Sequence, residues 1–373
     1  MSAEKPRHDF KRIASGFDLY GSFQSAAPYG SGHINDTFEL IYDQAGRPVR
    51  YILQRVNENV FKEGEALMEN IRRVTAHQRA KLAEADADEP SRRALTLVPA
   101  VDGRCFHRDG NGNLWRVYLF IERATGHDRI ETPAQAEAAA RAFGEFQLLL
   151  VDLPGGPLHE TIPKFHDTAS RFKTLLAAVE ADACNRAAGV KAEIDFALAR
   201  EADADRLLAL QRAGELPTVV THNDTKLNNV LLDDATGEGV CVIDLDTVMP
   251  GLALYDFGDM VRTATNSAPE DEPDVSKVYM RMPMFEALVR GYLSSAGGFL
   301  NATELALLPF SGKLLTFECA IRFLTDYLQG DVYFKTRRPG QNLDRCRSHF
   351  KLVASIEESH DAMLEVVRRA AAK

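Results

Sequence analysis

The chain has 373 residues, among which 54 Asp and Glu outnumber 44 Lys and Arg and give a formal net charge of -10. A chain of this length is expected to form two domains that each bury a core. Hydrophobic residues make up 45% and charged residues 26% of the sequence, which excludes a disordered or fibrous protein. The net acidity argues against a nucleic-acid partner, because such a partner requires a basic surface.

Nothing in the sequence predicts a membrane or secreted protein. No apolar run approaches the roughly 18–20 residues that cross a bilayer. The N-terminal segment MSAEKPRHDFKR is polar where a secretory signal would be apolar. The five cysteines are scattered and form no CxxC pair, so neither a disulfide framework nor a zinc site is expected. We therefore expect a soluble cytoplasmic protein with reduced thiols.

The first third of the chain is predicted to be β-rich with one helix. Strand-type segments alternate with turn residues such as DQAGRP. Apolar residues at helical spacing predict a helix over 59–82, and the charged segment 84–93 predicts a loop. The residues of the apolar helix face are Val60, Leu67, Ile71 and Val74. The expected strands are 37–42, 50–56, 95–100, 104–107 and 114–121.

Composition changes after Ile121, and the rest of the chain is predicted to be mainly helical. Pro133 stands at a first helical position and opens an Ala-rich segment. The expected helices are 133–151, 165–182, 192–213 and several from 274 onward, with short strands at 217–221, 230–233 and 240–245. The prediction is a two-lobed α+β fold, with a β-rich lobe at 1–121 and a helical lobe at 122–373.

The segment THNDTKLNNVLLD at 221–233 carries the most informative pattern. A strand is expected to deliver Asp224 into a loop that ends at Asn229, and Asp244 follows the next apolar run. This order suits phosphoryl transfer, in which a carboxylate accepts the proton of a hydroxyl while an amide and a second carboxylate hold Mg²⁺. Polar turns between strands are the alternative, but H-x-D-x4-N followed by an apolar run ending in Ile-Asp is much more specific than Asp-x4-Asn alone.

These residues resemble the catalytic core of the aminoglycoside phosphotransferase and choline kinase superfamily, and most closely its N-acetylhexosamine 1-kinases. The matching segments are GSGHINDTF (30–38), YILQRVN (51–57), HNDTKLNNVLLD (222–233), IDLDTVMPG (243–251), YDFGDMVR (255–262) and IRFLTDYLQGDVYF (321–334). The resemblance implies a protein-kinase-like fold and an ATP- and Mg²⁺-dependent kinase that phosphorylates the anomeric hydroxyl of an N-acetylhexosamine. Asp224 is then the base, and Asn229 and Asp244 hold the metal.

The resemblance also implies which residues hold the nucleotide phosphates. Gly30, Ser31, Gly32 and Asn35 form a turn where backbone N–H groups can approach phosphates. Asn35 stands where the third glycine of G-x-G-x-x-G would be, so the turn alone could be a plain hairpin.

Arg55 occupies the place of the phosphate-anchoring lysine of related kinases, with a forked contact in place of a point charge. A helix glutamate, Glu65 or Glu69, is expected to orient it, and Glu69 is favoured. The alternative for Arg55 is a solvent-facing charge on an edge strand. Adenine is expected near Ile121–Arg123.

Asp256-Phe257-Gly258 spells the D-F-G sequence in which protein kinases place a metal ligand. Asp256 follows PGLALY rather than an apolar strand, so we assign the metal to Asp244 and expect Asp256 to brace the catalytic loop. His222 is expected to brace the same loop through the backbone. Asp246 either supports the metal or orders the strand end.

On the acceptor side, the resemblance implies that His33, Arg322 and Tyr333 contact the substrate together with Asp224. The alternatives are a surface or ion-pair role for Arg322 and a half-buried core position for Tyr333. Two other functions stay open. The first is a kinase of the same fold for another sugar, for an amino-alcohol such as choline or for an aminoglycoside. The net acidity suits such a cationic substrate, but Arg322 opposes one.

The second is a catalytically inactive nucleotide-binding protein, against which the complete set of Asp224, Asn229 and Asp244 argues. The sequence does not distinguish GlcNAc from GalNAc, one anomer from the other, or ATP from GTP, and it gives no oligomeric state.

Overall fold

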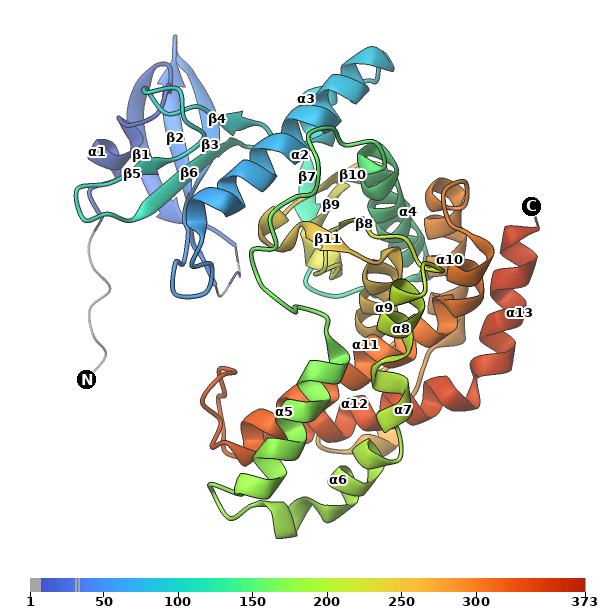
Figure 1. The fold of residues 1–373 in the computed structure, drawn as a ribbon. Helices are drawn as coiled ribbons and strands as arrows, with labels where there is room; N and C mark the ends of the chain where they lie inside the picture. The colour runs from blue at the N-terminus through green and yellow to red at the C-terminus, as the bar shows by residue number, and fades with distance from the viewer. Residues whose placement is uncertain (1–7, 31, 33, 373) are drawn as a thin grey trace. The chain divides into compact units, whose positions relative to one another are not determined.

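The computed structural model describes residues 8–30, 32 and 34–372 of the chain. The chain divides into two compact units (Figure 1). The first unit comprises Met1–Ala124, Asp152–Ile162 and Cys241–Asp246, and the second comprises Thr125–Val151, Pro163–Val240 and Thr247–Lys373. The predicted boundary between residues 121 and 122 stays a prediction.

An antiparallel sheet forms the main part of the first unit. The strand order is β1-β2-β3-β6-β4, and β5 also pairs with β6. The strands are β1 (Ser22–Pro28), β2 (Asp36–Gln44), β3 (Arg47–Arg55), β4 (Leu97–Val98), β5 (His107–Arg108) and β6 (Leu114–Leu119). The register pairs Leu40 with Tyr51 and Leu53 with Val117, so period-two alternation places these apolar side chains in one buried cluster with Trp115.

The long helix α2 (Gly64–Glu84) buries one face in the first unit, as the apolar spacing predicts. Leu67, Ile71 and Val74 are fully buried. Val60 lies before the helix and is 44% exposed, so its predicted place on the apolar face is wrong. Two short helices complete the unit: α1 (Phe10–Ala14) and α3 (Pro90–Arg93), the second inside the segment predicted as a loop.

The second unit is mostly helical. Its α-helices are α4 (Pro133–Leu150), α5 (Thr168–Ala181), α6 (Lys191–Leu198), α7 (Glu201–Ala204), α8 (Arg206–Arg212), α9 (Ala253–Ala264), α10 (Met282–Ala296), α11 (Ala302–Leu328), α12 (Gln341–Glu358) and α13 (His360–Ala371). The helix α11, orange in Figure 1, is buried on most of its surface and packs against α5, α9, α12 and α13. The single helix predicted over 192–213 is three short helices, with Arg200 between α6 and α7 paired to Glu357 of α12.

The packing of α4 against α10 requires a glycine. A Cβ added at Gly291 would lie 2.1 Å from the carbonyl oxygen of Glu137. No side chain fits that distance, so Gly291 permits the two helix backbones to approach closely.

Short strands and 3₁₀ turns lie between the helices along the chain. β8 (Val219–Thr221) pairs antiparallel with β11 (Met249–Gly251), and β10 (Gly239–Val242), β9 (Val230–Asp233) and β7 (Ala124–Gly126) form a three-stranded sheet. The 3₁₀ turns are η1 (Ala187–Val190), η2 (Leu227–Asn229), η3 (Leu245–Thr247) and η4 (Val275–Lys277). Strand β9 lies at the predicted residues. Among the described residues, no helix is long and apolar enough to cross a membrane.

Candidate active site

The loop of residues 222–226 follows β8 and is fixed by a buried carboxylate on α9. The backbone N–H groups of His222 and Asn223 donate to the carboxylate of Asp256, at 2.9 and 2.7 Å, and the hydroxyl of Thr225 donates to its carbonyl oxygen at 2.6 Å. Asp256 is fully buried, and burial raises the pKa of its carboxyl although these amide donors oppose the rise. The predicted bracing role of Asp256 is confirmed.

Asn223 carries an unusual backbone conformation, with φ of 64° in the left-handed region. Asn tolerates this region better than most residues. Its side chain accepts from the Thr221 hydroxyl at 3.0 Å and donates to the Thr247 carbonyl at 2.9 Å. A non-glycine residue in this region costs about 1–3 kcal/mol and persists only where several contacts fix it, as they do here directly before Asp224.

Asp224 is a partly accessible carboxylate with defined partners inside the loop. The Asn229 side-chain amide donates to the Asp224 carbonyl at 2.8 Å and to its carboxylate Oδ2 at 3.1 Å, while Lys226 Nζ lies 3.0 Å from Oδ2. Both partners of the Asn229 amide nitrogen are acceptors, so that nitrogen faces Asp224 and the amide oxygen points elsewhere. The Asp224 side chain is 27% exposed, which leaves it open to a substrate hydroxyl.

His222 supports this loop and does not act as its base. The ring is fully buried, 5.4 Å from the Phe143 ring between centroids, and its Nδ1 accepts the N–H of Asp224 at 3.3 Å. The predicted bracing role through the backbone is therefore confirmed.

Asp244 and Asp246 belong to the first unit and have different environments. Asp244 is exposed and has a left-handed backbone, with φ of 59°. Asp246 is buried; its carboxylate accepts from Arg116 and from the side-chain amide of Asn35, each at 2.5 Å. Since both of its oxygens are engaged by protein donors, Asp246 orders the segment after β10.

Arg116 is the main residue of the first unit that the sequence did not reveal. Its guanidinium is fully buried in β6, donates to Gln54 at 2.9 Å and pairs with Asp246. Burial opposes the charge, but the neighbouring carboxylates of Asp246 and Asp244 raise the pKa of Arg116 above its ordinary value. A single charged residue in the apolar strand LWRVYL was the available signal.

The predicted pairing of Arg55 with a helix glutamate is wrong. Arg55 donates to the Asp36 carboxylate from Nε at 2.9 Å and from Nη2 at 2.5 Å. Glu69 instead accepts two hydrogen bonds from Arg72, at 2.9 and 2.7 Å, and Glu65 lies 3.5 Å from Arg108. Arg72 stands one helical turn from Glu69 and satisfies its carboxylate locally, so the nucleotide role predicted for Glu69 has lost its basis.

The turn of the predicted phosphate contacts is described in part. Gly30 has φ of 76°, where glycine is favoured, and a Cβ at Gly32 would meet nothing within 4 Å. The Asn35 side chain donates to Asp246 and accepts the backbone N–H of Asn57 at 2.9 Å, which fixes its orientation. Ser31 and His33 lie outside the described residues.

Two predicted acceptor contacts, Arg322 and Tyr333, lie on α11 and just after it. The guanidinium of Arg322 stands 5.5 Å from the Phe334 ring centroid, and its residue is half-buried. Tyr333 is 70% exposed, so the alternative of a half-buried core position is wrong. The carboxylate of Asp326 accepts the N–H of Tyr333 at 2.7 Å and of Phe334 at 2.9 Å, which fixes the turn that carries both rings.

A second group of possible metal ligands lies elsewhere in the second unit. Ligand atoms of Glu270, Cys319 and His349 lie within 4.8 Å of one another. Arg345 and Arg262 face the same Glu270 carboxylate at 3.3 and 3.6 Å, and their positive charges already balance it. A divalent cation would be repelled here, so we read the group as an ion-pair cluster.

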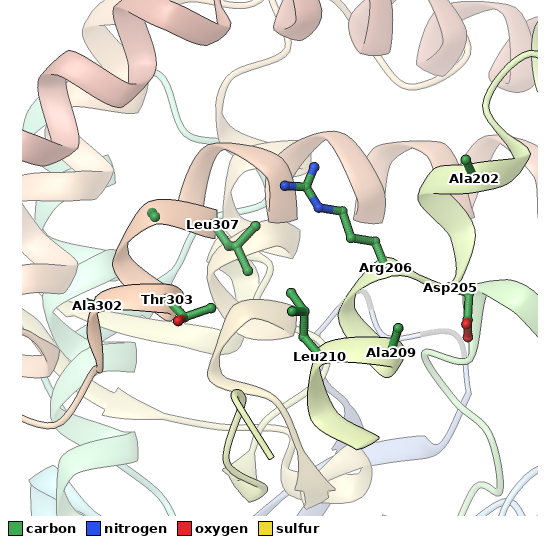
Figure 2. Close-up of a pocket in the computed structure, with 9 residues that line it drawn as sticks. Ala202, Asp205, Arg206, Ala209, Leu210, Ala302, Thr303 and Leu307 are labelled. Atoms are coloured by element: carbon green, nitrogen blue, oxygen red, sulfur yellow. The ribbon is translucent and has the colours of Figure 1, made fainter. Parts of the chain in front are cut away.

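A surface hollow of about 660 Å³ also lies in the second unit, lined by α7, α8 and the start of α11. Figure 2 shows Leu210 and Leu307 facing one another in it. The Arg206 guanidinium lies 4.4 Å from the Phe310 ring centroid. None of the predicted site residues lines this hollow.

The sequence matches the model of a family described as "Phosphotransferase enzyme family" (APH) over residues 25–294. This range includes more than half of the chain. The protein belongs to this family. Asp224, Asn229 and Asp244 of this APH phosphotransferase lie inside the matched range, whereas Arg322 and Tyr333 lie beyond it.

Solved structures similar to this APH protein share its fold. An aminoglycoside phosphotransferase from Alicyclobacillus acidocaldarius is 13% identical with a TM-score of 0.60, covering 99% of this chain and 98% of that chain. A microcompartment-associated aminopropanol kinase is 17% identical with a TM-score of 0.57, covering 95% and 97%. A choline kinase from Cryptosporidium parvum is 12% identical with a TM-score of 0.50, covering 97% and 96%. The predicted kinase-like α+β fold is confirmed.

Proposed function

We propose that this phosphotransferase moves the γ-phosphoryl group of ATP to the anomeric hydroxyl of an N-acetylhexosamine. The observation that carries the proposal is the loop of Asp224: an accessible carboxylate that is oriented by Asn229, in a loop whose backbone N–H groups are bonded to Asp256. Such a loop supplies the positioned base that a hydroxyl acceptor needs.

Asp224 accepts the proton as the acceptor oxygen bonds to the γ-phosphorus and the bond to the β–γ bridging oxygen breaks. The products are ADP and a sugar 1-phosphate. The amide of Asn229 holds Oδ2 in place, and Lys226 offers a positive charge beside it. The transfer is direct, and the carboxylate carries only a proton.

The residues available for Mg²⁺ suit that ion. The amide oxygen of Asn229 and the exposed carboxylate of Asp244 are hard oxygen donors. Mg²⁺ at these two residues would neutralise charge on the β- and γ-phosphates. Arg55 and the backbone of Gly30, Gly32 and Asn35 then hold the phosphates.

The charges near the predicted acceptor residues favour a neutral acceptor over a cation. Arg171 on α5 is half-buried, and its Nε finds no hydrogen-bond partner among the described residues. Burial and the nearby charge of Arg322 both lower the pKa of Arg171. Two adjacent guanidiniums repel an ammonium group, whereas the acetamido carbonyl or hydroxyls of a sugar would accept from them.

The test is ADP release from Mg²⁺-ATP with N-acetylhexosamines, plain hexoses, choline, an amino-alcohol and an aminoglycoside. We expect turnover with N-acetylated sugars and a loss of reducing-sugar reactivity, because a 1-phosphate blocks the reducing end. Asp224→Asn should lower kcat by about 10²–10⁴-fold. Turnover with the cations alone would overturn the acceptor, and nucleotide binding without turnover on any acceptor would overturn the activity.

A further inference from the structure

His166, which the sequence did not single out, contacts the backbone of the loop that carries Asp224. It precedes α5 and its side chain is only 7% exposed. Its Nδ1 is 2.9 Å from Oε1 of Glu318 on α11, and its Nε2 is 3.1 Å from the carbonyl oxygen of Asn223. The second oxygen of Glu318 accepts the hydroxyl of Thr168 at 2.6 Å.

These partners determine how many protons the ring carries. The Asn223 carbonyl can only accept, so Nε2 carries a proton. The partner of Nδ1 is a carboxyl oxygen, so the second proton lies on Nδ1 or on Glu318. Burial opposes the charge on both groups, but imidazole is the stronger base, the carboxylate raises the pKa of His166, and the histidine and Arg322 lower the pKa of Glu318. The pair is therefore an imidazolium and a carboxylate.

We propose that His166 is a positioning residue that holds Asp224 through the backbone, as an imidazolium balanced by Glu318. Asp256 holds the N–H of Asn223, and His166 holds its carbonyl oxygen, so the residue before Asp224 is fixed at both ends. Loss of the second contact frees the peptide that joins Asn223 to Asp224. The proposal rests on the assigned role of Asp224.

The surrounding charges support the protonated ring. α11 contributes Glu318 and, one turn later, Arg322, whose charge acts on Glu318. α9 contributes Tyr255, with ring centroids 5.0 Å apart, and Asp259, whose negative charge favours the imidazolium. Arg262 pairs with Asp259 at 2.7 Å, and the charge of Lys226 also acts on Asp259. The nearest charged partner of His166 is thus Glu318.

The first test measures the charge of the His166 ring. A long-range ¹H–¹⁵N spectrum of the full-length protein distinguishes imidazolium from either neutral tautomer, and the signal absent in His166→Gln identifies the residue. We expect imidazolium in the wild type at pH 7. A neutral ring there would overturn the proposal, whatever the acceptor of the enzyme is.

The second test measures catalysis in His166→Gln, which keeps one donor, and in Glu318→Gln. We expect kcat to fall by about 10–100-fold with an unchanged KM for ATP, since a displaced base costs rate more than nucleotide affinity. Removal of the Glu318 charge lowers the pKa of His166. A neutral ring keeps its proton on Nε2 but donates a weaker hydrogen bond to the Asn223 carbonyl than an imidazolium does, so the kcat of Glu318→Gln relative to wild type should fall as pH rises through neutrality and recover at acidic pH.

The matched control is His349→Asn, which removes another buried histidine of the second unit, on α12. It should leave kcat unchanged. Full activity of His166→Gln, or a Glu318→Gln defect that does not change with pH, would overturn the positioning role while the kinase assignment stands. Absence of transfer to every acceptor, with an imidazolium spectrum, would instead overturn the proposed function.

Discussion

Two buried carboxylates, one in each unit, hold functional segments by different means. Asp246 in the first unit pairs with the buried guanidinium of Arg116. Asp256 in the second unit has no cation at hydrogen-bond distance among the described residues and is held by two backbone N–H groups and the Gln147 amide. Removing one member of a buried ion pair leaves the other charge buried without a partner. Removing a carboxylate that is bonded to N–H groups leaves only neutral donors without a partner. The two acids should therefore respond differently to substitution.

The largest effect is expected for Asp246→Ala. The variant leaves Arg116 buried and charged without its carboxylate, and loss of one partner from a buried pair costs about 3–5 kcal/mol. A urea titration should show this loss in the free energy of unfolding. The double variant Arg116→Met with Asp246→Leu removes both charges and should recover most of it. A loss below about 1 kcal/mol in Asp246→Ala would contradict the pairing.

A smaller stability effect, with a distinct effect on catalysis, is expected for Asp256→Asn. The amide offers one acceptor oxygen in place of two, so His222 or Asn223 loses its partner at a cost of about 1–3 kcal/mol. Since these residues carry Asp224, kcat should also fall at an unchanged KM for ATP. Steady-state kinetics measures the effect on kcat, and a urea titration measures the effect on stability. An undiminished kcat would show that the loop does not need this carboxylate.

Two buried histidines allow the same comparison, because His166 has a carboxylate partner and His349 has a neutral carbonyl partner. Burial opposes the charge of both rings. Glu318 nevertheless raises the pKa of His166 above its usual value, whereas burial lowers the pKa of His349 to about 4, and the Nδ1 of His349 donates to the Arg345 carbonyl. A histidine whose pKa is raised in the folded state stabilises the fold at pH values below its pKa in the unfolded chain, about 6.5. That contribution to the free energy of unfolding is lost as pH rises through the pKa of the folded state. A histidine whose pKa is lowered in the folded state, such as His349, stabilises the fold at pH values above about 6.5, and that contribution is lost as pH falls toward about 4.

The measurement is the free energy of unfolding between pH 5 and 8 for wild type, His166→Gln and His349→Asn. The difference between wild type and His166→Gln should shrink as pH rises, and the difference for His349→Asn should grow. Slopes of the same sign would show that burial, and not the partner, sets both charges.

The sequence predicted those parts of the site that are local in the chain. Asp224, its loop and strand β9 follow from one segment of thirteen residues. Arg116 and Asp246 are separated by 130 positions, and His166 and Glu318 by 152, so no spacing within a motif could join them. Only the packed fold brings such pairs together, and for Arg116 the hint was one charge in an apolar strand.

The wrong prediction that Glu69 pairs with Arg55 arose because a local contact, and not a distant one, was missed. Its partner Arg72 lies three positions away on the same helix, a spacing that places two side chains side by side. The expectation of a long-range pair with Arg55 overlooked this local competitor. The helix α2 itself was predicted from its apolar face, because that periodicity is independent of tertiary partners.

The smallest effect is expected for Glu69→Ala, whose exposed pair with Arg72 is worth about 0.2–1 kcal/mol at most. It should leave the KM for ATP unchanged. Asp36→Asn should raise that KM by up to about 5-fold, because Asp36 orients the guanidinium proposed to hold phosphate. Steady-state kinetics over ATP concentration at saturating acceptor makes the comparison. A higher KM in Glu69→Ala than in Asp36→Asn would restore the glutamate as the partner of Arg55 in the working enzyme.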